Sequence, residues 1–335
     1  MPDASEWFWS RLACPIDRGA LHYSHHVLRC AANHSYPIVE DIPVLHVTHT
    51  DPTYPYWEQS FAEVLAPSPA PTADESGIDP FVQDQIVRTN GRLYKSIRGR
   101  LKRYPIPELR LPHGENDSRN DGWQPSFLDV GANWGRWTIA AARKGYRSVG
   151  VDSSFSALRA ARRVARQLKV EAHFVLGDAR SLPFTAGAFD LCFSYSVLQH
   201  FDKQVARRAL EEMSRVVAEN GRVLVQMPNC FGLLQLANRA RQILTGNRSP
   251  FRVRYWTPRE LRTVFEQAIG PSQIYADGFL SLDAQAADLD MLPWREAALV
   301  RLSEILRRTA RIFPPLNFAA DSLYVECRNT KTFEN

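Results

Sequence analysis

Short apolar runs alternate with longer amphipathic stretches over the last two thirds of the chain. The runs have the length of strands, and the stretches between them repeat apolar residues at helical spacing. This alternation predicts an α/β fold with a mostly parallel sheet. The predicted strands span residues 126–130, 147–151, 171–176, 189–196, 222–227, 273–279 and 322–328, and the predicted helices span 134–144, 154–168, 202–217 and a segment that begins at 257.

The first of these strands runs into a turn that glycine flanks on both sides. Gly131 and Gly135 stand between the strand and the helix that follows. In an open α/β sheet, ligands bind beyond the carboxyl ends of the strands, because helix N-termini and backbone amides converge there. Glycine lets the backbone approach a ligand closely. The turn therefore predicts a ligand site, although a tight strand-to-helix corner can carry the same glycines.

Acids stand at the ends of the next two predicted strands. Asp152 follows the second strand about twenty residues after the glycines, where a carboxylate can accept hydrogen bonds from both ribose hydroxyls. Asp178 follows the third strand, where it can accept from an adenine amino group while the next amide donates to a ring nitrogen. A nicotinamide enzyme has no need of this second acid, and the turn lacks the Gly-x-Gly-x-x-Gly spacing of a dinucleotide site.

These motifs, in this order, resemble those of class I S-adenosylmethionine-dependent methyltransferases with a methyltransferase type 11-like core. The segments that carry the resemblance are DVGANWG (129–135), VD (151–152), GDA (177–179), LPF (182–184), FD (189–190) and VLQH (197–200). They cover about residues 122–279, and the final strand also fits. Asn133 replaces the usual middle glycine, a variant that the family tolerates.

The resemblance implies a Rossmann-like seven-stranded sheet in the order 3-2-1-4-5-7-6, with strand 7 antiparallel, and S-adenosyl-L-methionine as the cofactor. The residues that would hold the cofactor are Asp129, Gly131, Asn133, Gly135, Asp152, Ser153, Asp178, Ala179 and Ser194. His200 follows the fourth strand, where the methyl group should point. An imidazole there can receive the proton that an oxygen or nitrogen acceptor loses, and the alternative is that His200 only supports the structure.

Residues 12–47 resemble the small zinc-ribbon-like domain that activates RNA and protein methyltransferases. The zinc-binding version needs two Cys-x-x-Cys pairs, because tetrahedral zinc takes four ligands. Here the pairs begin with Cys14 and Cys30 but end in Asp17 and Asn33, and His34 lies one residue beyond the expected spacing. Aspartate can bind zinc, but asparagine is a poor ligand, so we expect a metal-free β domain with both cysteines buried as small apolar side chains.

The chain divides into three predicted parts. Residues 1–50 form the small activator-like β domain, residues 51–120 a linker and helices that precede the core, and residues 121–335 the methyltransferase core. A helical insertion at about 281–320 separates the last two strands, and we expect it to form a lid on the acceptor side.

Four residues are candidates for substrate binding. In the family, helices before the core cover the cofactor, which makes Tyr94 and Arg98 candidates, with a solvated basic face as the alternative. Asn229 lies at the carboxyl end of the fifth strand, and Tyr255 lies in the basic, aromatic segment that follows.

The composition is that of a soluble globular protein. The 335 residues are 44% apolar and carry a formal net charge of +5. No apolar run has the length of a membrane span, and the first residues lack the order of a signal peptide. The five cysteines are scattered and odd in number, so we expect a cytoplasmic protein without a disulfide framework. The sequence leaves the oligomeric state open.

Three functions fit these features. The first is methyl transfer to an oxygen or nitrogen of a small molecule, glycan or lipid-linked acceptor, and the basic, aromatic insertions favour a sizeable or phosphorylated one. The second is methylation of RNA or protein, which the N-terminal domain suggests, but the sequence SYSV at 194–197 differs from the Asn-Pro-Pro-Tyr-type motif of such enzymes. The third is a non-catalytic partner subunit, which should have lost Asp152 and Asp178. We expect the first, with nucleic acid as the less favoured partner.

Overall fold

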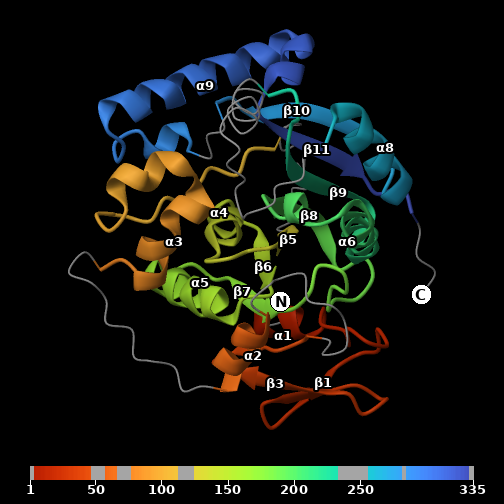
Figure 1. Ribbon diagram of the computed structural model, residues 1–335. Coiled ribbons are helices and arrows are strands. Elements are labelled where there is room, and N and C mark those ends of the chain that lie inside the picture. The colour runs from red at the N-terminus through yellow and green to blue at the C-terminus, as the bar shows by residue number, and fades with distance from the viewer. Residues whose placement is uncertain are drawn as a thin grey trace.

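A mixed seven-stranded sheet forms the centre of the chain (Figure 1). The computed structural model in which it is seen describes residues 4–46, 57–65, 77–111, 124–232, 256–280 and 284–331. The strands of this sheet are β5 (Ser126–Val130), β6 (Arg147–Asp152), β7 (His173–Leu176), β8 (Phe189–Tyr195), β9 (Val217–Pro228), β10 (Ser272–Gly278) and β11 (Ser322–Arg328).

The strand order across this sheet is β10-β11-β9-β8-β5-β6-β7. The strands β5 to β9 pair in parallel, whereas β11 is antiparallel to both of its neighbours. Numbered from β5 in chain order, the sheet reads 3-2-1-4-5-7-6 from one edge to the other. The predicted fold class and strand order are therefore confirmed.

Helices cover both faces of the sheet. They are α3 (Pro80–Asn90), α4 (Arg136–Arg143), α5 (Phe155–Gln167), α6 (Lys203–Val216) and α8 (Pro258–Ala268). Successive strand residues point to opposite faces, so neighbouring residues of β5 belong to different buried clusters. Phe127 belongs to the cluster that contains side chains of α3, α4 and α5, and Leu128 to the one that contains side chains of α6 and α8. Side-chain oxygens of Ser154, Asp202 and Thr257 cap α5, α6 and α8, as the sequence predicts.

A boundary differs from the prediction where α6 meets β9. The helix ends at Val216 and the strand begins at once with Val217, although the sequence predicts a helix to 217 and a strand from 222. Val217 pairs with Phe189 before the register shifts, and Asn220 takes a φ of 61°. Asn220 and Gly221 therefore lie in the irregular first part of β9 and do not end the helix.

The N-terminal domain carries a separate four-stranded antiparallel sheet. After α1 (Ala4–Trp9) come β1 (His22–Ser24), β2 (Val27–Arg29), β3 (Ser35–Val39) and β4 (Ile42–Pro43), which pair in chain order. The sequence predicts one bent strand where β3 and β4 stand. A turn separates the two, because Glu40 and Asp41 both adopt positive φ angles, 51° and 58°.

This small domain covers the β7 edge of the large sheet (Figure 1). The amide of Leu45 donates to the carbonyl of Leu176 at 2.8 Å, and the amide of Ala13 donates to that of Pro183 at 3.0 Å. Apolar side chains of the small domain, including Phe8 and Leu12, belong to the same buried cluster as Val151 of β6. The edge strand is thereby paired and covered rather than exposed.

The predicted insertion between β10 and β11 contains the long helix α9 (Trp294–Ile312) and the 3₁₀ helix η4 (Pro314–Ala319). The helix packs along β10, where Ser303 Oγ exchanges two hydrogen bonds of 3.0 Å with the backbone of Phe279. Its predicted role as a lid stays a prediction. Among the described residues, no helix combines the length and the apolar character that crossing a bilayer requires.

Replacing Leu12 with alanine should lower the free energy of unfolding by about 2–4 kcal/mol, because it leaves a cavity in the shared core. Leu12 is 2% exposed and its backbone bridges to Phe184. Urea unfolding, followed by circular dichroism and tryptophan fluorescence, should show one transition at lower urea. The control Ile16→Ala, in the same loop but 49% exposed, should leave the midpoint unchanged. A separate early transition, with the main one unmoved, would contradict a shared core.

Candidate functional site

The turn between β5 and α4 is built from backbone in the left-handed region. Gly131, Asn133 and Gly135 have φ angles of 83°, 49° and 79°. The side-chain oxygen of Asn133 accepts from the amide of Trp134 at 2.8 Å, a local bond that favours this conformation in asparagine. This explains how asparagine replaces the usual middle glycine without changing the turn. The turn ends at the N-terminus of α4, whose first amides point out of the helix.

Asp152 is bonded across the turn at the end of β6. One carboxylate oxygen accepts from the amide of Asn133 and the other from the amide of Ser154, both at 2.8 Å. Burial raises the pKa of Asp152, against the lowering effect of these amides. The residue is partly exposed, and a carboxylate has about four acceptor sites, so Asp152 can accept further bonds from a ligand.

Asp178 lies in the loop after β7 and pairs with an arginine of its own loop. Its carboxylate accepts from Nε and Nη2 of Arg180, the latter at 2.7 Å, and from the Arg180 amide at 2.8 Å. It is 3% exposed, whereas Ala179 is partly exposed. The sequence does not predict this pairing, which leaves the carboxylate less capacity to accept from an adenine amino group.

Three other predicted cofactor residues support the turn from beneath or from the side. Asp129 is 1% exposed and accepts from Thr138 Oγ1 at 2.7 Å, and burial raises the pKa of Asp129 to about 7. Ser194 is fully buried and donates to the carbonyl of Val130. The carbonyl of Ser153 accepts from Ser60 on α2 (Trp57–Leu65) at 2.8 Å. The Asp129 and Ser194 side chains therefore shape the turn rather than line an open surface.

The loop after β8 closes onto the turn. A Cβ atom at Gly131 would lie 2.1 Å from Cγ2 of Val197, so this position admits only glycine. His200 is partly exposed at the end of the 3₁₀ helix η2 (Leu198–His200), and its Nε2 lies 3.3 Å from Nε2 of Gln199. The structure thus places His200 in the loop after β8 that borders the turn, and its catalytic role stays a prediction.

The candidate substrate residues do not gather at one place. Tyr94 is fully buried, and burial together with the nearby Asp288 carboxylate raises the pKa of Tyr94. Arg98 is exposed and pairs with Asp84 on α3. Tyr255 lies outside the described residues.

Asn229 is fully buried and acts as a clamp on backbone. Its amide nitrogen donates to the carbonyls of Phe318 and Ala320, both at 2.8 Å, and its side-chain oxygen accepts from the amide of Phe231. These bonds use the polar atoms of Asn229 to hold the loop after β9 against the end of the α9 insertion. They give its predicted substrate role no support.

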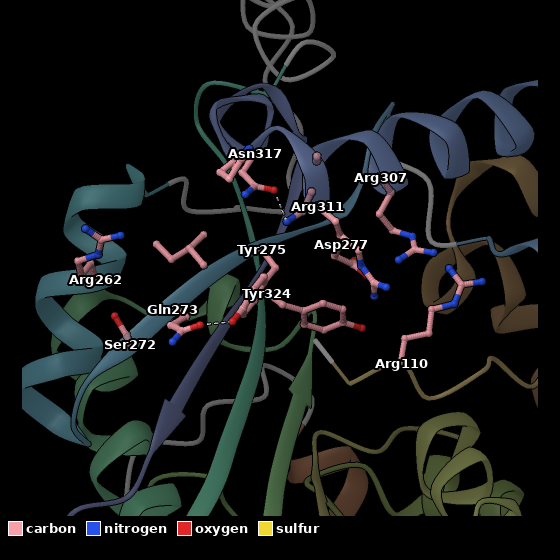
Figure 2. Close-up of a pocket in the computed structure, with 14 residues that line it drawn as sticks. Arg110, Arg262, Ser272, Gln273, Tyr275, Asp277, Arg307, Arg311, Asn317 and Tyr324 are labelled. Atoms are coloured by element: carbon pink, nitrogen blue, oxygen red, sulfur yellow. Dashed lines mark hydrogen bonds between the residues drawn. The ribbon is translucent and has the colours of Figure 1, made fainter. Parts of the chain in front are cut away.

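A pocket of about 450 Å³ lies beside β10, between α8 and α9 (Figure 2). Its charged wall is rich in arginine, with Arg110 and Arg307 turned toward each other and both paired with Glu304, at 2.5 and 2.9 Å. The further arginines of the lining are Arg262 and Arg311. Such a wall suits an anionic ligand.

The pocket is linked to the end of β8 by a buried hydrogen-bond pair. Asp277 lines the pocket and accepts from Tyr195 Oη at 2.9 Å and from Ser322 Oγ at 2.7 Å. The guanidinium of Arg136, at the start of α4, lies 5.2 Å from the Tyr195 ring centroid. The sequence analysis missed these residues, because Tyr195 and Asp277 are 82 positions apart and only the tertiary fold joins them.

Known proteins resemble the part of the chain that contains the turn between β5 and α4. Residues 127–221 match a family model described as a methyltransferase domain. A Xenopus tropicalis tRNA (carboxymethyluridine(34)-5-O)-methyltransferase is 36% identical over 164 residues, which cover 46% of this chain and 23% of the relative. Malonyl-[acyl-carrier protein] O-methyltransferase of Serratia marcescens is 30% identical over 117 residues, 35% of this chain and 44% of the relative.

The chain therefore spans less than half the length of either curated relative. Among solved structures, magnesium protoporphyrin IX methyltransferase of Synechocystis PCC 6803 aligns with a TM-score of 0.41 at 14% identity, over 62% of this chain and 74% of that one. The family match and the strand order agree on the same region. Residues 127–221 therefore belong to a methyltransferase domain, and the sheet that contains them has the strand order that the resemblance to class I, S-adenosylmethionine-dependent methyltransferases implies.

Proposed function

We propose that this chain transfers a methyl group from S-adenosylmethionine to an oxygen or nitrogen atom of an anionic small molecule, glycan or lipid-linked acceptor. The observation that carries the proposal is the turn at 131–135 with Asp152 bonded across it. It joins bare backbone, a helix N-terminus and a partly exposed carboxylate at the carboxyl ends of β5 and β6.

The cofactor would bind with its adenosine between Asp152 and the loop after β7. The ribose hydroxyls would donate to the two Asp152 oxygens, which each already accept one amide. The adenine amino group would share the Asp178 carboxylate with Arg180, and the Ala179 backbone would complete the contact. The methionine carboxylate would then lie along the turn, near the amides at the N-terminus of α4.

The reaction is an in-line displacement. The acceptor lone pair forms a bond to the methyl carbon while the carbon–sulfur bond breaks, and S-adenosylhomocysteine leaves with the bonding electrons. Holding acceptor, methyl and sulfur on one axis supplies most of the rate. A hydroxyl or amine acceptor also loses a proton, and we assign its receipt to His200, in the loop that closes on Gly131.

The arginine-rich pocket supports an anionic acceptor. Arg110 and Arg307 both pair with Glu304, and Arg110 also pairs with Glu108. The four arginines of the lining still outnumber these two acids and Asp277, so positive charge is in excess. Guanidinium groups bind phosphates and carboxylates through paired N–H donors. The bond from Tyr195 to Asp277 ties this pocket to the strand that leads into the His200 loop.

An RNA acceptor is the second candidate. The relative that is 36% identical is named for a tRNA substrate, and RNA phosphates would suit the same arginines. Incubation of the protein with methyl-labelled S-adenosylmethionine and separate tRNA, lipid and small-molecule fractions distinguishes the two. Label that enters only tRNA would replace the first candidate with the second.

The change Asp152→Ala should weaken S-adenosylmethionine binding about 10-fold to 150-fold, which corresponds to about 1.5–3 kcal/mol for hydrogen bonds to a charged acceptor. Titration calorimetry measures the loss. Asp202→Ala removes a carboxylate that caps α6, a helix that does not carry the cofactor turn, and should leave affinity unchanged. Equal affinity of the Asp152 variant and the parent would remove Asp152 from the site.

The change His200→Ala should lower kcat about a hundredfold to ten-thousandfold while cofactor affinity stays the same, because general-base help has this size. The rate should also lose the rise near neutral pH that an imidazole base produces. Gln199→Ala keeps the imidazole and serves as the neighbouring control. Turnover within a few-fold of the parent, with the same pH profile, would leave alignment alone as the source of the rate.

The change Arg311→Gln should raise the KM for an anionic acceptor about 5-fold to 30-fold, the size of one lost charge-assisted hydrogen bond. Arg311 and Arg308 are both exposed on α9, but only Arg311 lines the pocket. Labelling of the acceptor fraction at limiting concentration should therefore fall in Arg311→Gln but not in Arg308→Gln. Identical labelling by both variants would exclude the pocket from acceptor binding.

A further inference from the structure

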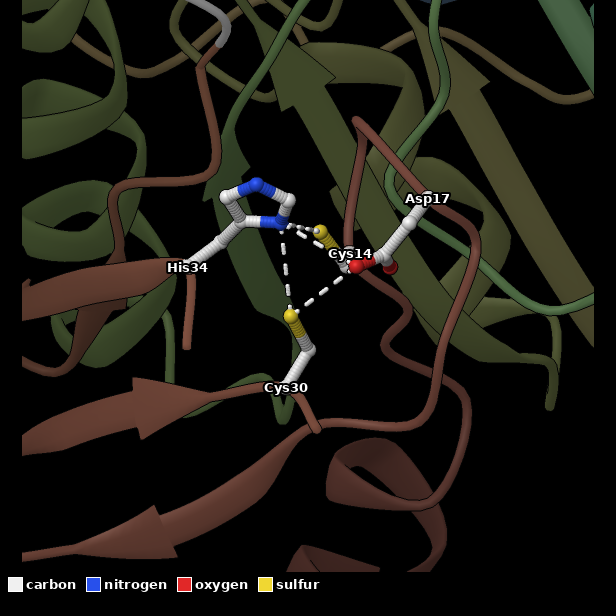
Figure 3. Close-up of side chains that lie close together, drawn as sticks. All are labelled: Cys14, Asp17, Cys30 and His34. Carbon is white, nitrogen blue, oxygen red and sulfur yellow. Dashed lines mark hydrogen bonds and ion pairs between the residues drawn. The ribbon is translucent and has the colours of Figure 1, made fainter. Parts of the chain in front are cut away.

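Two loops of the N-terminal domain turn four polar side chains toward one point (Figure 3). They are the side chains of Cys14, Asp17, Cys30 and His34, and one ligand atom of each lies within 4.8 Å of the others. His34 Nδ1 is 3.4 Å from both sulfur atoms. Asp17 Oδ2 is 3.1 Å from the sulfur of Cys30 and from His34 Nδ1.

These separations are close to those of a tetrahedral metal site. Zinc bonds of about 2.3 Å to sulfur and about 2.0 Å to nitrogen or oxygen place neighbouring ligand atoms roughly 3.3–3.8 Å apart. Two thiolates, an imidazole and a carboxylate are also the donors that zinc accepts. Cys14 and Cys30 are buried, whereas Asp17 and His34 side chains are 30% and 34% exposed, which leaves an entry path for the ion.

The sequence spacing points to Asn33 as the fourth position, and the structure puts His34 there instead. Asn33 has a φ of 64°, its amide donates to the carbonyl of Cys30, and its side chain is exposed. The amide of Cys30 in turn donates to the carbonyl of His34. Because of this tight loop, the side chain that faces the cysteines is His34, one residue later than the Cys-x-x-Cys spacing predicts.

The other ligand loop is fixed by bonds that do not use the ligand atoms facing the site. The amide of Gly19 donates to Asp17 Oδ1 at 2.8 Å, which leaves Oδ2 directed at Cys30 and His34. The amide of Arg18 donates to the carbonyl of Cys14 at 2.9 Å. Tyr36 Oη lies 3.1 Å from the sulfur of Cys14, where it can donate to a thiolate that binds metal.

The loop that carries Cys14 and Asp17 also holds the loop after β7. Ser181 Oγ donates to the carbonyl of Pro15 at 2.7 Å, and Arg18 Nη1 donates to the carbonyl of Leu182 at 3.0 Å. Arg18 also pairs with Glu212, which accepts from the amide of Leu182 at 2.8 Å. The segment held in this way follows Asp178 and Ala179 directly.

We propose that Cys14, Asp17, Cys30 and His34 bind one zinc ion, and that this ion fixes the loop at 178–184 on which adenine would rest. The effect of the ion on the loop rests on the proposed function. The binding of zinc depends only on the four side chains that would bind it. Zinc thus acts as a structural clamp between the N-terminal domain and the cofactor crevice, and it takes no part in methyl transfer.

Metal analysis of the purified full chain tests the first part. The parent should contain one equivalent of zinc, and His34→Ala and Cys30→Ser should lose at least nine tenths of it. Asn33→Gly is the matched control, because it removes the residue at the Cys-x-x-Cys spacing but permits the left-handed backbone, and it should keep the zinc. Loss of zinc in Asn33→Gly with full retention in His34→Ala would overturn the assigned ligand set.

Two measurements on the parent protein avoid dependence on variants that fail to fold. Zinc removed by a chelator should be taken up again in a one-to-one titration that raises the thermal midpoint. Cobalt in its place should give the charge-transfer absorption of a thiolate-bound tetrahedral ion. Zinc content below one tenth of an equivalent, together with no uptake in micromolar zinc, would overturn the site.

Binding of S-adenosylhomocysteine to zinc-loaded and zinc-free parent tests the second part. The affinity should fall about 10-fold when zinc is removed and return when it is restored, because ordering the adenine loop then costs binding free energy. Equal affinity in both forms would overturn the coupling. No binding in either form would instead contradict the proposed function, while the metal analysis would stand.

Discussion

No side chain fits at Gly131, where the ends of β5 and β6 and the loop after β8 meet. A Cβ atom there would lie 2.1 Å from Val197, and the φ of 83° is one that other residues rarely adopt. The Gly131 amide donates to the carbonyl of Val151 at 2.8 Å, which ties the turn to β6. Asp152 then spans the turn from the other side. The geometry of the turn therefore depends on one crowded backbone position.

The N-terminal domain covers the β7 edge of the large sheet. A parallel edge strand such as β7 exposes unpaired backbone groups, and the bond from Leu45 to Leu176 satisfies one of them. Because Leu12 and Phe8 lie in the same core as β6, the two parts share their stability. The adenine loop lies between them, with Ser181 bonded to the small domain and Leu182 bonded to Glu212 of α6. The conformation of the loop after β7 therefore depends on contacts with both the N-terminal domain and the helix α6.

Local features of this chain were readable from the sequence. Ser154, Asp202 and Thr257 cap their helices as spacing predicts, because a cap requires only the dihedral angles and hydrogen bonds of a few neighbouring residues. The strand order follows from the resemblance to the methyltransferase family and is confirmed. The turn and Asp152 come together because parallel strands end at one edge.

Other features depend on contacts that no local pattern encodes. The two carbonyls to which Asn229 donates lie about 90 residues further along the chain, so these bonds could not be anticipated from the sequence. The pairing of Tyr195 with Asp277 arises in the same way. His34 was passed over for a more local reason, since the left-handed conformation of Asn33 shifts the facing residue by one. The Cys-x-x-Cys spacing assumes one particular loop conformation, and a single residue with positive φ changes that conformation.

Asp129 is a buried acid beneath the turn, and its protonation makes the stability of the fold depend on pH. Burial, with a further contribution from the Asp152 charge, raises the pKa of Asp129 from 3.8 to about 7. The folded state then holds a proton that the unfolded state releases, so the free energy of unfolding falls as pH rises from about 4 to about 7. A cation bound near Asp129 would favour its charged form and recover part of that loss.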